Sequence, residues 1–442
     1  MTQSYFYLLI GLVYSLSLFI GWWHKTDDRS GTQYLLGGKQ FATWQLTLTI
    51  LAAQLGGGSL LGTCDTARTH GWGGIAYGAG MALGLLLIGF FFAEKLQRLP
   101  SGTISQALGT LYHSRSLQQI AAVLSIVTLF CSLIATAVAM RKLFHFVGAP
   151  DAVFLLFWAV FITYTVLGGL RAVILTDIVQ AICILGILLL FTGYMYFYSD
   201  LDLTAHGIQF LHQPADAEAI SWLDWILMPA LFVIIGQDMG QRCFAATSPK
   251  SIQTAMKAAA VLILLCVLVP VSVGVLTRNL GLSISPGTST LLTSVQQLTT
   301  PWLTMLVTAA VLMAIISTAD SLLCALSSNF GFDFHLHKHI RWLQGLTTLA
   351  GILAACASFF LQDIISTLLL GYELSVCILL VPFLSAMLFR STCLPAAFSA
   401  MGVGAALFAS TQWTPWITCW EILLANIATY VGVVKWTKRP LL

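Results

Sequence analysis

The chain has 442 residues, of which 58% are hydrophobic and only 8% are charged. Soluble domains carry about 25% charged residues, so this composition excludes an ordinary soluble protein. The net charge of +3 is small and gives no indication of a nucleic-acid partner. Apolar stretches of about 20 residues recur along the whole length, and each is long enough to cross a lipid bilayer. The sequence therefore predicts an all-α polytopic membrane protein.

Hydropathy predicts about 13 transmembrane helices when the apolar window is matched to the thickness of a membrane. The predicted spans are 4–23, 42–63, 72–94, 117–140, 152–168, 174–197, 221–241, 254–276, 301–328, 342–361, 364–389, 393–410 and 416–434. The first span is long and lacks a small-residue cleavage site, so we expect a retained helix and not a signal peptide.

The positions of Lys and Arg predict the orientation, because these residues accumulate in cytoplasmic loops. With the N-terminus outside and the C-terminus in the cytoplasm, every Lys and Arg, Arg242 included, falls on the cytoplasmic side, with four exceptions. The exceptions are Arg68, Arg141, Lys142 and Arg278. We therefore expect this orientation, and the short loops favour a bacterial inner membrane.

Two predicted spans are interrupted by glycine. The second contains "LGGGSLLG" at Leu55–Gly62, and the seventh contains "IIGQDMGQR" at Ile234–Arg242. Glycine weakens a helix and frees backbone groups, which a membrane tolerates only where they line a cavity or meet a ligand. Interrupted helices at corresponding positions of two halves indicate a binding site between repeats. Close helix packing explains the first glycine run equally well when that run is taken alone.

A carboxylate lies within the ninth span, in the stretch "AIISTADSLLCALSS" at Ala314–Ser328. Ser317, Asp320 and Ser321 share one helix face, because residues three and four apart are neighbours, and Thr318 lies about 100° round from Ser317. Hydroxyl and carboxylate oxygens are the ligands of hard cations such as Na⁺. The alternative is structural, with hydroxyls bonded to the preceding turn and Asp320 paired to another helix.

A second intramembrane acid is Asp177, in "TYTVLGGLRAVILTDIVQ". Thr176 and Gln180 lie beside it, and Arg171 could form a structural ion pair with it at the cytoplasmic edge. No metalloprotease, nucleophile-elbow, P-loop or dinucleotide signature occurs. We therefore expect neither an enzyme nor an ATP-driven pump.

Three stretches in this order resemble the sodium:solute symporter family: "GGLRAVILTDIVQ", "QRCFAATSPK" and "AIISTADSLLCALSS". Within it, "LGGGSLLGTCDTA", "SWLD" and "GYELSVCILLVP" look most like the high-affinity choline transporter branch. The resemblance implies a leucine-transporter-type fold with two inverted five-helix repeats plus additional helices. It divides the chain into an N-terminal extra helix and cytoplasmic loop (1–41), a first repeat (42–200), an outside loop (201–220), a second repeat (221–390) and two C-terminal helices with a short basic tail (391–442).

The resemblance also implies sodium-driven uptake and the residues that hold the ion. The principal sodium site would comprise Ala52, Leu55, Ala314, Ser317 and Thr318. A second sodium ion, or a proton in its place, would lie at Asp177, joined by Ser317, Asp320 and Ser321.

Choline carriers enclose the quaternary ammonium in aromatic faces, and the positions that align with that cage are not aromatic here. They are Gln54, Met81, Cys131 and Gly236. The remaining predicted substrate residues are polar, namely Ser59, Gln237, Asp238, Tyr372 and Glu373. Hydrogen bonding would then replace stacking, although Glu373 or Arg242 could simply pair with Asp238.

These residues predict a sodium-coupled symporter for a small polar organic solute, cationic or zwitterionic. One alternative is a proton-coupled transporter of the same fold, with Asp177 and Asp320 as the relay. The other is a transport-silent membrane sensor. The sequence leaves the oligomeric state open.

Overall fold

The computed structural model describes residues 11, 15, 31–37, 41–197, 222–285, 287–411 and 418–437. Across these ranges every regular element is a helix, and the one β contact is an isolated bridge between Phe41 and Ala246. The all-α fold class is therefore confirmed. The first predicted span, 4–23, lies almost wholly outside the described residues, and so do the predicted 201–220 loop and the end of the basic tail.

The helices follow the predicted spans from residue 42 onward. In the first half they are α2 (Gly31–Leu36), α3 (Thr43–Gln54), η1 (Gly58–Gly62), α4 (Thr63–His70), η2 (Gly71–Gly74), α5 (Ile75–Leu87), η3 (Ile88–Phe92), α6 (Ala93–Arg98), α7 (Ile104–Leu111), α8 (Arg115–Phe146) and α9 (Asp151–Phe197). In the second half they are α11 (Trp222–Ile235), α12 (Gln237–Ala245), α13 (Pro249–Asn279), α14 (Thr290–Leu298), α15 (Pro301–Ser328), η4 (Asn329–Asp333), η5 (Leu336–Lys338), α16 (Ile340–Ala357), α17 (Ile364–Phe389), α18 (Leu394–Ser410) and α19 (Cys419–Thr437).

Within the described ranges, seven helices are long and apolar enough to cross a membrane, or eight when one bent pair counts as a single span. The total of about 13 spans therefore stays a prediction. The chain also turns inside α9 at Gly169, whose φ of 66° is left-handed. This turn separates the two spans predicted at 152–168 and 174–197, and glycine is the residue that adopts it without strain.

Both predicted helix breaks are confirmed. Helix α3 ends at Gln54, and the chain resumes as the π-helix η1 before α4 begins. Helices α11 and α12 are bent by 43° to one another at Gly236, whose ψ of 127° is extended. Each break leaves backbone groups of a buried helix free for other partners.

The helix contacts are reciprocal between the two halves. In the broken pair of the second half, α11 packs on α5 of the first half. In the broken pair of the first half, α3 and α4 both pack on α13 of the second half. Likewise, α15 packs on α9, whereas α8 packs on α16 and α17. A two-fold relation between halves requires this exchange of partners. The pattern supports the predicted inverted repeats, whose bounds of 42–200 and 221–390 stay a prediction.

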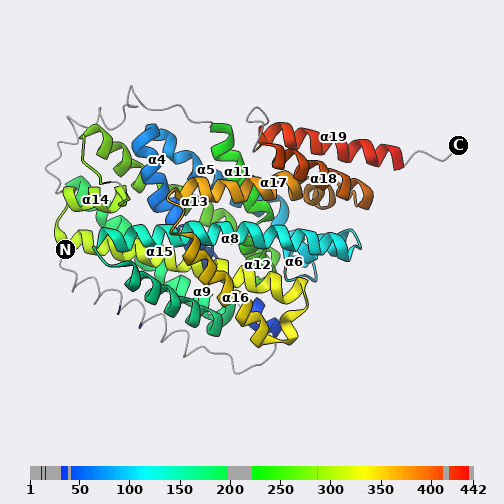
Figure 1. Ribbon diagram of the computed structural model, residues 1–442, viewed down its shortest axis with the longest axis horizontal. Coiled ribbons are helices and arrows are strands. Elements are labelled where there is room, and N and C mark those ends of the chain that lie inside the picture. Colours follow the sequence, from blue (N-terminus) through cyan, green and yellow to red (C-terminus); the bar gives the residue numbers. More distant parts are fainter. Residues whose placement is uncertain are drawn as a thin grey trace.

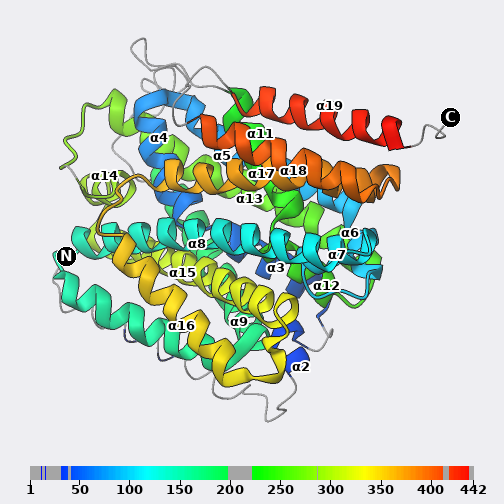
Figure 2. The same ribbon diagram turned by 45° about the vertical axis from the view of Figure 1, so that its right-hand side comes forward.

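The arrangement leaves the broken helices inside the bundle. Helices α18 and α19 form one edge, and α9 and α16 lie at the opposite edge (Figures 1 and 2). Helices α8, α13 and α15 run between these edges, and the turns of α3 next to its break are buried among them. The break in α3 therefore opens onto protein and not onto lipid, as free backbone groups in a membrane require.

Candidate functional site

A cluster of oxygen atoms forms where the end of α3 meets the middle of α15. The Ser317 hydroxyl donates to the Ala52 carbonyl at 2.8 Å and to the Ala314 carbonyl at 3.1 Å. The Thr318 hydroxyl donates to the Ala53 carbonyl at 3.0 Å and approaches that of Ala52 at 3.4 Å. These two hydroxyls and three carbonyls are the neutral oxygen cluster, which contains four of the five predicted sodium residues.

The fifth, Leu55, is buried at the first position of the break, and its amide donates to Leu51. The chain can approach α15 here because Gly56 follows. A Cβ atom at Gly56 would lie 2.3 Å from the Thr318 hydroxyl oxygen. That distance is a steric clash, so only glycine fits at this position. The break and the absence of a side chain therefore act together to bring α3 carbonyls against α15.

The donor set of the neutral oxygen cluster suits a hard cation. All five atoms are oxygens, and hard cations are bound by carbonyl and hydroxyl oxygens. A hydroxyl hydrogen rotates freely, so Ser317 and Thr318 can turn their lone pairs toward an ion. Both hydroxyls come from side chains that are buried or nearly so, which removes the competing water.

One turn further along α15, the chemistry changes from neutral to charged. The Arg242 guanidinium is fully buried and donates to Asp177 at 3.2 Å, to Ser321 at 2.7 Å and to Thr49 at 3.2 Å. Its other terminal nitrogen donates to the Asp238 carbonyl at 2.9 Å. This guanidinium cluster joins α3, α9, α12 and α15 around a single internal cation.

The guanidinium cluster corrects three expectations. Asp177 pairs with Arg242, 65 positions away in sequence, and not with Arg171. Arg242 is not a cytoplasmic loop residue, because its side chain is 0% exposed in the interior. It also meets Asp238 through the backbone carbonyl and not through the carboxylate. Helix α12 continues to Ala245, past the predicted end of the span at residue 241, so Arg242 lies within a buried helix and not in a loop.

Asp320 does not face the guanidinium. Its carboxylate accepts hydrogen bonds from Tyr164 at 2.7 Å and from Thr165, both on α9, and it forms no ion pair within the described ranges. The structure therefore divides the predicted second site. Asp177 and Ser321 share Arg242, while Asp320 is bound by hydroxyl groups.

Next to the neutral oxygen cluster lies a cavity of about 40 Å³. Five predicted substrate residues line it, namely Gln54, Ser59, Met81, Asp238 and Tyr372. The Gln54 amide nitrogen donates to the Asp238 carboxylate at 2.9 Å, which links the two broken helices directly. The other carboxylate oxygen of Asp238 is buried without a hydrogen-bond partner in the described structure. The cavity therefore carries acceptor capacity toward a cation.

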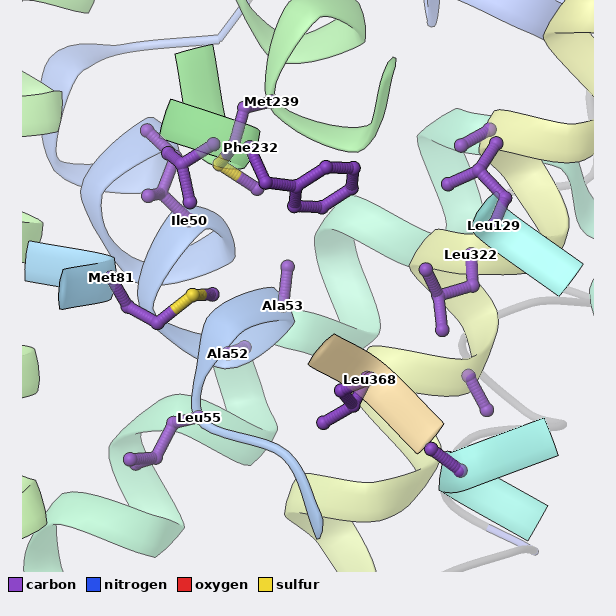
Figure 3. Packing of buried hydrophobic residues seen from close by; sticks show 14 of the residues in the cluster. Ile50, Ala52, Ala53, Leu55, Met81, Leu129, Phe232, Met239, Leu322 and Leu368 are labelled. Atoms are coloured by element: carbon purple, nitrogen blue, oxygen red, sulfur yellow. The ribbon is translucent and has the colours of Figure 1, made fainter. Parts of the chain in front are cut away.

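The cavity also has an aromatic wall, in which Tyr372 was predicted while Tyr77 and Phe232 were missed. Phe232 and Tyr372 stack with ring centroids 4.0 Å apart, and the hydroxyls of Tyr77 and Tyr372 lie 3.2 Å apart. Figure 3 shows Phe232 with Met81 and Leu368 around the end of α3. Aromatic rings are therefore present at other helix positions, and the expectation that hydrogen bonding replaces stacking stays a prediction.

Four predicted substrate residues do not line the cavity. Gln237 instead binds the Gly102 carbonyl and the Ile104 amide before α7. Gly236 forms the bend, Cys131 lies against Gly371, and Glu373 contacts Cys419. The Gln237 contacts tie the second broken helix to the loop before α7.

Two of the missed residues left a signal in the sequence. Tyr77 lies four residues before Met81, which was predicted, and Phe232 lies four residues before Gly236. Residues four apart share a helix face, so each aromatic side chain could have been assigned to the site. Tyr164 and Thr165 had no such signal, because they approach Asp320 from a distant part of the sequence.

Known proteins resemble this chain in sequence and in fold. The model of the sodium:solute symporter family matches residues 34–344. The high-affinity choline transporter 1 of Torpedo marmorata is 26% identical over 428 residues, which cover 86% of this chain and 72% of that protein.

Two solved structures share the fold. One is a Na⁺-coupled sialic acid symporter in a substrate-bound outward-open state, with a TM-score of 0.77 at 16% identity, covering 96% of this chain and 95% of that one. The other is MHP1, a nucleobase-cation-symport-1 family transporter in a closed conformation with bromovinylhydantoin bound, with a TM-score of 0.61 at 15% identity, covering 94% and 97%. The leucine-transporter-type fold is thereby confirmed.

Proposed function

We propose that this chain, which belongs to the sodium:solute symporter family and is a sodium-coupled symporter, imports a small organic cation or zwitterion of the choline type. Transport is driven by inward Na⁺, and the chain is a transporter and not an enzyme. The neutral oxygen cluster carries the proposal, because it lies beside a cavity that combines a carboxylate with aromatic faces.

The proposed sodium position is the neutral oxygen cluster. There Ser317 and Thr318 supply hydroxyl oxygens and Ala52 and Ala314 supply carbonyls, with Leu55 at the break beside them. The Na⁺ ion bridges α3 and α15, so its binding favours the conformation in which these helices are in contact. A solute that favours the same conformation is then coupled to the ion, as linkage requires.

We propose one sodium ion per solute. The other predicted position, at Asp177 and Ser321, already shares the positive charge of Arg242. A second ion would bring like charge against a buried guanidinium, which is unfavourable in a low-dielectric interior. Sodium-driven uptake should then show a Hill coefficient near one.

The proposed solute position is the cavity. A volume of about 40 Å³ holds about three water molecules, so the surrounding helices must part to admit an organic solute. Asp238 lies at the cavity with an unpartnered carboxylate oxygen, and Tyr77, Phe232 and Tyr372 offer ring faces that attract a cation. An anionic solute would bring like charge toward Asp238, which is why we propose a cation or a zwitterion.

The test uses the purified protein and three probes in NaCl: choline, glycine betaine and dimethylbutanol, an uncharged isostere of choline. We expect choline or betaine to raise the thermal stability by mass action, and dimethylbutanol not to. Asp238→Asn should weaken the response to the solute more than tenfold and leave the response to Na⁺ intact. Asp363→Asn, at an exposed helix cap, is the control. Equal responses to choline and to dimethylbutanol would contradict the proposed cation recognition.

Proton coupling is the second candidate, and Asp320 is the residue that favours it. Its carboxylate is fully buried, has hydroxyl partners and lacks an ion pair within the described ranges. Asp320→Asn removes a proton carrier and keeps the shape of the side chain. Under our proposal this variant keeps sodium-driven uptake in proteoliposomes. Uptake that a pH gradient drives without Na⁺, and that the variant abolishes, would establish proton coupling instead.

A further inference from the structure

An apolar groove of about 840 Å³ runs along one edge of the bundle, between α11, α17 and α19. It shares no lining residue with the central cavity, so it is independent of the transport site. The side chains that line it on α19 include Leu424, Ile427 and Val431, which are 66%, 49% and 44% exposed. Figure 2 shows α19 at the margin of the molecule, beyond α17 and α18.

The groove follows most of the length of α19. Trp420 and Lys435 both line it and both lie on α19, so it extends for about 22 Å at 1.5 Å per residue. One half of a bilayer measures about 15 Å of hydrocarbon plus several ångströms of headgroup. A single acyl chain with its headgroup therefore fits along α19.

The two ends of the groove differ in charge. At one end the Trp420 indole donates to Asp224 at 2.7 Å, which ties α19 to α11. At the other end lie Ser391 and Lys435. Lys435 is exposed and forms no ion pair within the described ranges. Arg390, next to Ser391, is likewise exposed and without an ion pair there. This basic end complements a phosphate.

We propose that the groove binds one anionic phospholipid, with an acyl chain along α19 and the phosphate at Lys435. Apolar contact alone does not select an occupant in a membrane, because lipid tails are as apolar as the helix face. The same argument disfavours a second copy of the chain, which would gain no hydrophobic driving force. The basic end provides the selectivity, since Lys and Arg near the membrane surface attract anionic lipids.

Retained lipid can be measured by native mass spectrometry of the full chain. The protein is equilibrated with equal amounts of phosphatidylglycerol and phosphatidylcholine that carry the same acyl chains. We expect one retained lipid, predominantly phosphatidylglycerol. Lys435→Gln should reduce that preference about fivefold, the effect of one surface charge. Lys338→Gln, at the end of η5, is the matched control and should leave the preference unchanged.

A second pair of variants tests the groove itself. Ile427→Trp fills it and should abolish lipid retention, whereas Ile352→Trp on α16 should not. The two isoleucines are matched, because each is 49% exposed and faces outward from the bundle. A cooperative thermal unfolding transition, measured on the same samples, confirms that each variant is folded.

Three results would overturn the proposal. The first is equal retention of the two lipids by the parent protein. The second is undiminished retention by Ile427→Trp. The third is a dimer that Ile427→Trp dissociates, which would assign the groove to a second copy of the chain. None of them bears on sodium binding, so the transport proposal is judged separately.

Discussion

Two neighbouring turns of α15 satisfy their buried polar groups in different ways. Ser317 and Thr318 meet the carbonyls of α3 without any formal charge. One turn later, Ser321 joins Asp177 and Arg242 in the guanidinium cluster, where opposite charges are paired internally. The two turns lie on one helix and differ mainly in whether the charge is built into the protein.

This difference supports the proposal that Na⁺ binds reversibly at the neutral oxygen cluster. A site lined only by neutral oxygens leaves no uncompensated charge behind when its cation departs. A buried carboxylate without a partner would be costly in every conformation that lacks the ion. The guanidinium cluster therefore suits a permanent connection between α3, α9, α12 and α15, and the neutral oxygen cluster suits a reversible one.

The largest expected effect on stability comes from breaking the guanidinium cluster. Arg242→Met leaves Asp177 buried without its cation and should destabilise the protein by about 3–5 kcal/mol, as breaking a buried ion pair does. Unfolding in detergent measures the loss. The double variant Arg242→Met with Asp177→Leu should recover much of it, and Arg341→Met on the exposed start of α16 is the control. A cost below about 1 kcal/mol would show that the ion pair is not needed for stability.

A smaller effect is expected in the neutral oxygen cluster, and it concerns ion binding more than folding. Thr318→Ala or Ser317→Ala removes one oxygen ligand of a cation, a contact worth about 1.5–3 kcal/mol. Sodium affinity should fall by a factor of ten or more, measured from thermal stability in NaCl against KCl at equal ionic strength. Thr308→Ala is the control, because its hydroxyl bonds only back to Thr304 on the same helix. An unchanged sodium response in both site variants would show that Na⁺ does not bind at the neutral oxygen cluster.

The smallest effect concerns Asp320, which belongs to neither cluster. Tyr164→Phe removes one of its two hydroxyl donors and should cost about 1 kcal/mol if the carboxyl group is neutral. Unfolding measurements distinguish this from a charged group, whose hydrogen bonds are worth about 1.5–3 kcal/mol. A loss of stability above about 2 kcal/mol would show that Asp320 carries a negative charge. Asp320 would then resemble the charged residues of the guanidinium cluster.

Local patterns in the sequence predicted the parts of the site that depend on local geometry. The breaks at Leu55–Gly62 and Gly236 follow from glycine in a buried helix. The shared face of Ser317 and Ser321 follows from helical periodicity. These features require only neighbouring residues, so they can be derived without knowing the fold.

The partners across helices could not be derived in this way. Asp177 lies 65 positions from Arg242, and Gln54 lies 184 positions from Asp238. Helical periodicity says which face a side chain occupies but not which of several polar groups on other helices it meets. The charge of Arg242 was also misleading, because a basic residue at the end of a span normally marks a cytoplasmic loop.

The three consecutive glycines of the first break have a consequence for how this site can evolve. A Cβ atom would lie 2.3 Å from Thr318 at Gly56, 2.3 Å from Ala139 at Gly57 and 2.6 Å from Leu368 at Gly58. Each glycine is thus fitted to a different helix, namely α15, α8 or α17. Any missense mutation at these codons adds a side chain, so Gly56 and Gly57 require a change in the opposing helix, whereas Gly58 meets the end of the flexible Leu368 side chain. Substitution of Gly56 or Gly57 is therefore coupled to a change on another helix.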